Sequence, residues 1–141
     1  MIDTCNKNNN NKIISTQASG REFIIKNNQS LNINKVEVDN CYITDGLRCD
    51  YLFEIIKNKT VVKVFYLELK GSDINHAIKQ LETTIKHCQN IHFDAIKECH
   101  IVASKYKAPS SGQKSQKTRS EFKRKNKIQL FIKSKIKEVT V

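Results

Sequence analysis

The chain has 141 residues, of which 38% are hydrophobic and 28% are charged, and its formal net charge is +11. This length predicts a single domain. No apolar stretch approaches the roughly 20 residues that cross a bilayer, so the sequence argues against a transmembrane protein. The N-terminal sequence MIDTCNKNNNNK contains no apolar run of the kind that a secretory signal requires, so we expect no such signal.

The cysteine content bears on the cellular compartment. The five cysteines are Cys5, Cys41, Cys49, Cys88 and Cys99. Their number is odd and no CxxC motif occurs, so a secreted disulfide framework is not expected. We therefore expect reduced thiols and a cytoplasmic location.

The first half of the chain alternates between polar segments and strands. Residues 1–12 are rich in Asn and Lys and are predicted to be disordered, which leaves 13–141 as the single domain. Residues 15–21 are small and polar and predict a loop. Runs of β-branched and aromatic residues predict strands, with a hairpin tip at 57–60. The predicted strands are 23–25, 31–38, 48–56 and 61–70.

A helix is predicted directly after these strands. Ser72 or Asp73 can cap its first turn. Apolar residues then recur at spacings of three and four, which predicts a helix over 73–89. The remaining predicted elements are a strand at 95–104, a short helix at 121–127 and closing strands at 129–132 and 136–141. This order predicts an α/β (α+β) fold with a mixed central β-sheet.

The excess positive charge lies near the end of the chain. Between Lys105 and Lys137 there are 12 basic residues and one acid, Glu121, so this basic loop and tail carries the whole excess of +11. Such a segment attracts polyanions through phosphate neutralisation. A solvated lysine-rich tail explains the charge equally well. The residues expected to bind a nucleic-acid backbone are Arg48, Lys114, Lys117, Arg119, Lys123, Arg124, Lys125 and Lys127.

Two acids are expected to meet across the predicted hairpin. If its tip is centred near Lys59, residues whose numbers sum to about 118 lie opposite each other, so Asp50 faces Glu68. Lys70 lies two positions after Glu68 and shares its face. The opposite face is apolar and is expected to pack against the predicted helix. Its residues are Tyr51, Phe53, Ile55, Phe65, Leu67 and Leu69.

This triple of residue types favours metal-dependent chemistry. Two carboxylates that close repel each other unless a cation lies between them. Mg²⁺ is commonly held by one or two carboxylates, water and substrate phosphate. A metal-bound water beside Lys70 could then attack a phosphodiester. The alternative is a solvated strand face, on which Asp50, Glu68 and Lys70 carry no function.

Asp50, followed after a hairpin by Glu68-Leu69-Lys70, resembles the signature of the PD-(D/E)xK superfamily of restriction-endonuclease-like nucleases. The resemblance covers about the central half of the chain. It implies a restriction-endonuclease-like core with helices flanking a mixed sheet. It also implies that Asp50 and Glu68 bind Mg²⁺, that the Leu69 carbonyl can ligate the metal and that Lys70 helps to activate water. Mn²⁺ is expected to substitute for Mg²⁺ in such a site.

Further positions match or depart from this family. Gln80 lies where some branches place a helical glutamine, so it is expected to support catalysis. The tyrosine that those branches place four residues later is Thr84 here, and the family's proline before the aspartate is Cys49. Glu22 and Glu37 are candidates for an acid that many members place in an N-terminal helix.

The sequence therefore predicts a Mg²⁺-dependent nuclease, with a DNA endonuclease favoured by the resemblance. A junction-resolving enzyme is an alternative within the same class. A non-catalytic nucleic-acid-binding protein, or a protein-interaction module on the same fold, is the alternative outside it. No membrane partner is expected. A homodimer is plausible, because a chain this small covers little duplex.

Overall fold

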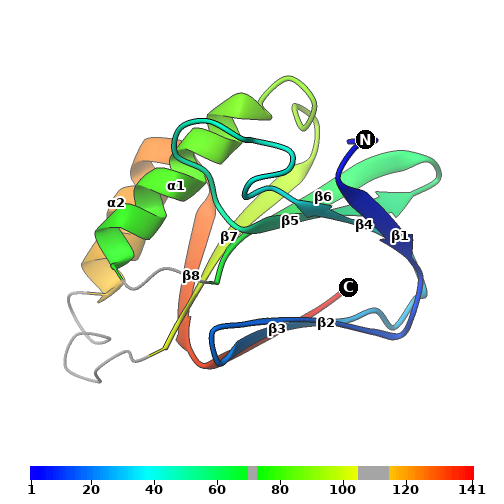
Figure 1. The fold of residues 1–141 in the computed structure, drawn as a ribbon, viewed down its shortest axis with the longest axis horizontal. Coiled ribbons are helices and arrows are strands. Elements are labelled where there is room, and N and C mark those ends of the chain that lie inside the picture. Colours follow the sequence, from blue (N-terminus) through cyan, green and yellow to red (C-terminus); the bar gives the residue numbers. More distant parts are fainter. Residues whose placement is uncertain (70–72, 105–114) are drawn as a thin grey trace.

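A computed structural model describes residues 1–69, 73–104 and 115–141 of the chain. It combines a six-stranded sheet, a three-stranded sheet and two helices (Figure 1). In chain order the elements are β1 (Asn6–Asn9), β2 (Ile13–Ala18), β3 (Arg21–Lys26), β4 (Asn32–Glu37), β5 (Tyr51–Lys57), β6 (Thr60–Glu68), α1 (Ile74–His87), β7 (Ile96–Ala103), α2 (Ser115–Asn126), β8 (Gln129–Ser134) and β9 (Ile136–Thr140).

The larger sheet is mixed, as the sequence predicts. Its strand order is β1-β4-β5-β6-β7-β8. The pairs from β1 to β6 are antiparallel, whereas β7 runs parallel to both β6 and β8. Helix α1 connects β6 to β7, and α2 follows β7 and precedes β8, so both parallel connections carry a helix. The two helices lie side by side over one face of this sheet (Figure 1).

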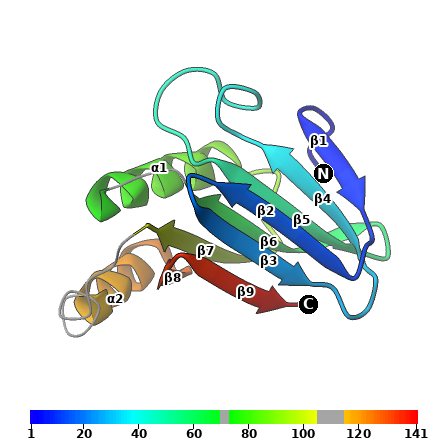
Figure 2. The same ribbon diagram turned by 60° about the horizontal axis from the view of Figure 1, so that its bottom comes forward.

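The smaller sheet covers the other face. It has the order β2-β3-β9, with β3 antiparallel to β2 and parallel to β9. Figure 2 shows these three strands lying over the larger sheet, on the side away from the helices. The molecule therefore has three layers, and a sheet takes the place of the flanking helices expected on that side.

Each face of the larger sheet has its own apolar core. On the helix side, Leu52, Val64 and Tyr66 pack with Ala77 and Leu81 of α1. On the other side, the apolar set of the predicted hairpin packs with Phe23 and Ile25 of the smaller sheet. The expectation that this set faces the helix is wrong. Period-two alternation shows which side chains share a face, but not which layer covers that face.

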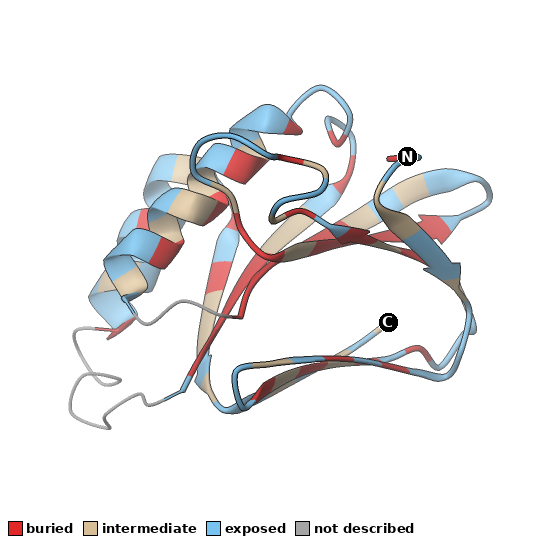
Figure 3. Ribbon diagram, in the orientation of Figure 1, coloured by how far each residue is buried: buried red, intermediate tan, exposed pale blue. Residues whose placement is uncertain are grey.

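The predicted hairpin register is confirmed. Paired residues from Tyr51–Leu67 to Ile55–Lys63 have numbers that sum to 118, and an irregularity follows between Ile55 and Ile56. Figure 3 shows that buried residues run along the centre of this sheet, whereas the helices are buried mainly on the side that faces it. The hairpin therefore has the predicted register and lies in the buried centre of the sheet.

The N-terminal segment differs from the expected disorder. Asn6–Asn9 form β1 and pair with β4. Ile2 is only 3% exposed, and its N–H donates a 3.0 Å hydrogen bond to Oε1 of Glu54. Cys5 also forms a disulfide with Cys41. The expectation of five reduced cysteines is therefore wrong for this pair, because β1 brings together two residues that lie 36 positions apart.

Two other boundaries also differ from expectation. The predicted loop at 15–21 is mostly strand β2, and the turn is confined to Ser19-Gly20, where both residues have positive φ. Helix α2 begins at Ser115 rather than near Glu121, within the predicted basic loop. Only Ser115 and Phe122 of α2 are buried, so the sequence carries no apolar periodicity that would mark its start.

Helix α1 follows the prediction closely. Its N-cap is Asp73, whose side chain accepts hydrogen bonds from the N–H groups of Asn75 and His76 at 2.9 and 3.4 Å. These contacts satisfy donors that the first turn leaves without intrahelical partners. In the described ranges, no helix has the length and apolarity needed to span a membrane.

Candidate active site

The two predicted acids lie at the open end of the β5–β6 hairpin. Asp50 directly precedes β5, and Glu68 is the last residue of β6. The N–H of Asp50 donates a 3.1 Å hydrogen bond to the Leu67 carbonyl, which extends the strand pairing one step beyond Tyr51. Alternation then places Asp50 and Glu68 on the helix side of the sheet, as neighbours across the hairpin. Their side chains are buried, with relative exposures of 4% and 2%.

The position of Asp50 is set by contacts from two directions. The N–H groups of Val38 and Asp39 donate to its carbonyl oxygen at 3.0 and 3.3 Å. The N–H of Leu69 donates to its Oδ2 at 2.6 Å. This last bond connects the residue before β5 with the residue after β6. The carboxylate is thus held by the backbone that also carries Glu68.

The donor chemistry of this pair fits a hard divalent cation. Two carboxylates buried side by side disfavour their joint ionisation unless positive charge is close. Mg²⁺ is usually bound in proteins by one or two carboxylates, with water and substrate oxygens completing the shell. In the described part of the chain, no group of three or more His, Cys, Asp or Glu side chains could hold a metal ion. Asp50 and Glu68 form a pair only, and Mg²⁺ binding by this pair stays a prediction.

The third expected ligand, the Leu69 carbonyl, has a cationic neighbour. Nη1 of Arg21 donates a 2.6 Å hydrogen bond to this oxygen and a 3.3 Å bond to the Val102 carbonyl. Arg21 begins β3 and is only 6% exposed. Arg21 is not among the site residues predicted from the sequence. The pattern that could have identified this residue is its alternation with Phe23 and Ile25, which places Arg21 on the core-facing side of β3.

Helix α1 contacts the segment that leads into Asp50. Nε2 of Gln80 donates a 3.1 Å hydrogen bond to the Arg48 carbonyl, and the N–H of Cys49 donates to Oγ1 of Thr84 at 2.9 Å. Oε1 of Gln80 is buried and has no hydrogen-bond partner among the residues that the structure describes. Gln80 and Thr84 thus fix the segment before Asp50 against α1.

The Arg48 side chain is bound to its own loop. Its Nε donates to Oδ1 of Asp39 at 2.9 Å, its Nη2 to Oδ1 of Asn40 at 2.8 Å and its Nη1 to the Gly46 carbonyl at 2.8 Å. These contacts close the loop between β4 and Asp50. Arg48 thus helps to close this loop, and its predicted contact with phosphate stays a prediction.

The two candidates for an additional acid lie apart from the pair. Glu22 accepts hydrogen bonds from Ser15 and Gln17 on neighbouring strand β2. Glu37 is paired with Tyr51, so alternation places it on the sheet face opposite to Asp50. The predicted residues Lys70 and Lys114 lie outside the described residues.

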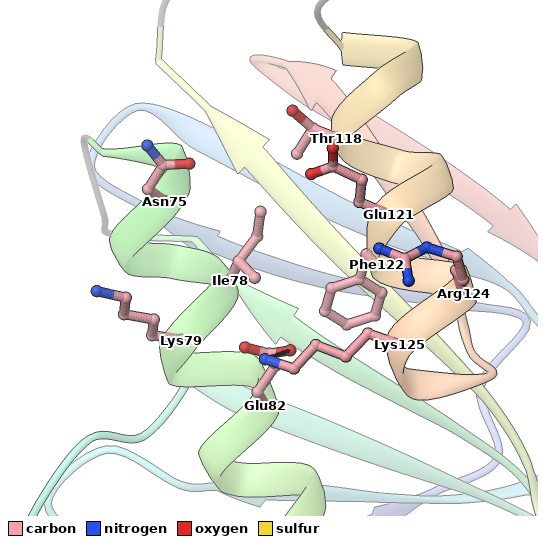
Figure 4. A pocket seen from close by; sticks show the side chains of 9 residues that line it. All are labelled: Asn75, Ile78, Lys79, Glu82, Thr118, Glu121, Phe122, Arg124 and Lys125. Carbon is pink, nitrogen blue, oxygen red and sulfur yellow. Dashed lines mark ion pairs between the residues drawn. The ribbon is translucent and has the colours of Figure 1, made fainter.

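Helix α2 presents the predicted basic residues to solvent. Lys117, Arg119, Lys123, Arg124 and Lys125 are all exposed, as is Lys127 directly after the helix. A groove of about 660 Å³ lies between α1 and α2 (Figure 4). Lys79, Arg124 and Lys125 contribute to its walls, and Lys125 forms a 3.1 Å ion pair with Glu82 across it.

Two histidines, His92 and His100, and the free thiols belong to the core. His92 is buried between Tyr66 and Glu54, with hydrogen bonds of 2.6 Å to each. His100 stacks on Phe131 at a centroid distance of 4.8 Å. The free thiols are those of Cys49, Cys88 and Cys99, all buried.

Burial controls the protonation of these thiols. It raises the pKa of Cys88 to about 12 and raises the pKa of Cys49 and Cys99 further above the ordinary thiol value. A thiolate is the reactive form of cysteine, so these three residues are not candidates for a nucleophile. The acid pair remains the candidate site.

Comparison of the chain with protein-family models, with curated proteins and with solved structures finds no match.

Proposed function

We propose that the chain is a Mg²⁺-dependent nuclease that hydrolyses phosphodiester bonds, with DNA as the favoured substrate. The observation that carries the proposal is the buried pair Asp50 and Glu68, on one face of adjoining strands, with the Leu69 N–H bound to Oδ2 of Asp50. A solvated surface face would leave these carboxylates exposed, and they are buried instead.

The arrangement of elements supports a restriction-endonuclease-like core. Strands β4, β5 and β6 are antiparallel, with Asp50 directly before β5 and Glu68 at the end of β6, and α1 follows before parallel strand β7. The proposed site lies at the carboxyl end of β6, next to the segment that Gln80 and Thr84 of α1 contact. Ligands of α/β folds commonly bind at the carboxyl ends of parallel strands.

Each residue of the proposed site has a distinct role. Asp50 and Glu68 would hold Mg²⁺, which, when bound, makes a coordinated water more acidic and offsets charge on the phosphate. The backbone contacts of Asp50 fix its carboxylate before substrate binds. Lys70 would orient the attacking water and accept or return a proton. Gln80 would keep the Arg48–Asp50 segment against α1.

The basic surface of α2 would bind the nucleic-acid backbone. Lys and Arg neutralise phosphates irrespective of base sequence, and their side chains on α2 extend into solvent. The helix lies beside α1, whose first turn follows the strand that ends at Glu68. Helix α2 therefore lies on the same side of the larger sheet as the acid pair.

Cleavage and binding assays test this proposal. Purified protein is incubated with single-stranded, duplex and branched DNA and with RNA, in Mg²⁺, Mn²⁺ or EDTA. We expect cleavage that requires the divalent ion and that Lys70→Ala abolishes, with nucleic-acid binding unchanged. Lys57→Ala, which removes an exposed lysine near the hairpin turn, is the matched control and should cleave normally. Cleavage that persists in EDTA, or in Lys70→Ala, contradicts the proposal.

A second candidate is a nucleic-acid-binding protein without catalysis. The exposed basic residues of α2 favour it, because none of them contributes to the acid pair. Salt-sensitive binding of every nucleic acid, without cleavage in any divalent ion, would select this candidate over the nuclease.

A further inference from the structure

We infer that Arg21 is a positioning residue of the proposed site, and that its guanidinium takes the place of a metal ion as the partner of the Leu69 carbonyl. A cation at the site would then be held by Asp50 and Glu68 without that carbonyl. This inference rests on the proposed nuclease function and identifies a residue outside the signature motif.

The contacts of Arg21 connect the two sheets beside the acid pair. Arg21 is the first residue of β3, in the smaller sheet, and its side chain reaches the larger sheet. There Nη1 donates to the carbonyls of Leu69 and Val102, which lie at the carboxyl ends of the neighbouring parallel strands β6 and β7. The 2.6 Å bond to Leu69 is short, and hydrogen bonds from a charged donor are shorter than those between neutral groups.

Both backbone polar groups of Leu69 form hydrogen bonds at the site. Its N–H donates to Oδ2 of Asp50, and its carbonyl accepts from Arg21. A displacement of the carbonyl would therefore shift the N–H that orients Asp50, and would move the backbone next to Glu68. Arg21 acts on both acids through this one residue.

Electrostatic repulsion between cations opposes the binding of a metal ion by the Leu69 carbonyl. A guanidinium is protonated at every physiological pH. Two cations that share one carbonyl oxygen repel each other strongly at such short range, especially where burial lowers the local dielectric. Because Arg21 is nearly fully buried, its charge is poorly screened at this position. The Leu69 oxygen is thus a poor ligand for a divalent ion.

Two substitutions of Arg21 test the positioning role. Arg21→Met keeps an unbranched stem and loses the guanidinium with all its hydrogen bonds, whereas Arg21→Lys keeps the charge and can bond one carbonyl. Lys12→Met is the matched control, because Lys12 donates to the Asn28 carbonyl at the far end of the same hairpin. Ile25→Val, in the core of the smaller sheet, controls for a general loss of stability.

We expect Arg21→Met to raise the Kd for Mn²⁺, measured by calorimetry, by about tenfold, which corresponds to about 1.4 kcal/mol. We expect kcat to fall by about 100-fold, as a small displacement of reacting groups can cause, while KM for DNA stays within about twofold. Arg21→Lys should recover part of both losses. Lys12→Met and Ile25→Val should match the wild-type values.

An unchanged Kd for Mn²⁺ and unchanged kcat in folded Arg21→Met would overturn the positioning role. If Arg21→Met fails to fold, Arg21→Lys decides: values equal to the wild type overturn it, and reduced values support it. Hydrogen exchange at the Leu69 amide separates this inference from the proposed function. Faster exchange in the Arg21 variants supports the coupling even if no substrate is cleaved, and unchanged exchange contradicts it.

The ligand set is tested by NMR. Leu69-Lys70 is the only Leu-Lys pair in the chain, so ¹³C-carbonyl leucine with ¹⁵N lysine reports the Leu69 carbonyl alone. We expect saturating Mg²⁺ to shift this signal no more than that of the Val102 carbonyl, which bonds to the same guanidinium and is observed through the unique Val-Ala pair. A much larger shift at Leu69 would show that this carbonyl ligates the metal.

Discussion

The backbone N–H of Leu69 donates a 2.6 Å hydrogen bond to Oδ2 of Asp50. The bond crosses the open end of the β5–β6 hairpin and joins residues 19 positions apart. It holds one proposed metal ligand, Asp50, against the strand that carries the other, Glu68. The carbonyl of the same residue accepts a hydrogen bond from Arg21, so a guanidinium and a carboxylate bind the two backbone polar groups of Leu69.

Substitution of Asp50 separates metal binding from folding. Asp50→Asn keeps an oxygen that can accept the Leu69 N–H but removes the charge. We expect Mg²⁺ or Mn²⁺ to raise the melting temperature of the wild type but not that of Asp50→Asn, because a ligand stabilises only a fold that binds it. Cleavage should fall at least about 100-fold. Asp94→Asn, at an exposed acid, is the control and should keep both properties.

Neutralising α2 should weaken binding without altering sequence preference. For Lys123→Gln with Arg124→Gln, we expect the slope of log K against log salt to fall by about one for each phosphate contact that is lost. Fluorescence anisotropy with duplex DNA at several salt concentrations measures this slope. The control is Lys57→Gln with Lys59→Gln, which removes the same charge at the turn of the β5–β6 hairpin. An equal effect in both pairs would show that net charge, rather than α2, controls binding.

The disulfide should stabilise the fold measurably. Closing a loop with a sequence separation of 36 contributes roughly 3–4 kcal/mol in the chain-entropy model. We expect Cys5→Ser with Cys41→Ser to lower the free energy of unfolding by up to about that amount, measured by denaturant titration. A reductant should bring the wild type to the same value and leave the double variant unchanged. Identical wild-type curves with and without reductant would refute the prediction.

Acid should destabilise the protein partly through Glu98. Hydrogen bonding with His100, opposed by burial and assisted by Lys63, lowers the pKa of Glu98 to about 2. The unfolded carboxyl has a pKa near 4.5. The unfolded state therefore binds more protons between these values, so this contribution is complete above about pH 4.5 and is lost as the pH falls toward 2.

Glu98→Gln isolates this effect. We expect the free energy of unfolding of this variant to depend less steeply on pH between about 4.5 and 2 than that of the wild type, in denaturant titrations at several pH values. Lys63→Met removes one partner at 2.8 Å and should give an intermediate slope. Parallel curves for the wild type and Glu98→Gln would show that Glu98 does not contribute.

Sequence periodicity predicted the centre of this fold well. The strands that became β5 and β6, their register and helix α1 all follow from local alternation, turn residues and an N-cap. The approach of Asp50 to Glu68 follows from the same register. The enzymatic role of the pair remains a prediction, because chemistry depends on what a bound substrate and metal would contact.

Long-range contacts decided the rest. Local residue patterns do not report which layer covers a sheet face, so the smaller sheet and its contact with the apolar hairpin face were not foreseeable. Strand β1, the Cys5–Cys41 disulfide and the contact of Arg21 with Leu69 each join segments that are distant along the chain. The sequence by itself determined which residues share a strand face and where a turn brings two acids together, since both depend on spacings of a few residues. Tertiary structure alone decided what surrounds those acids, because burial and partner choice arise only when separate layers pack.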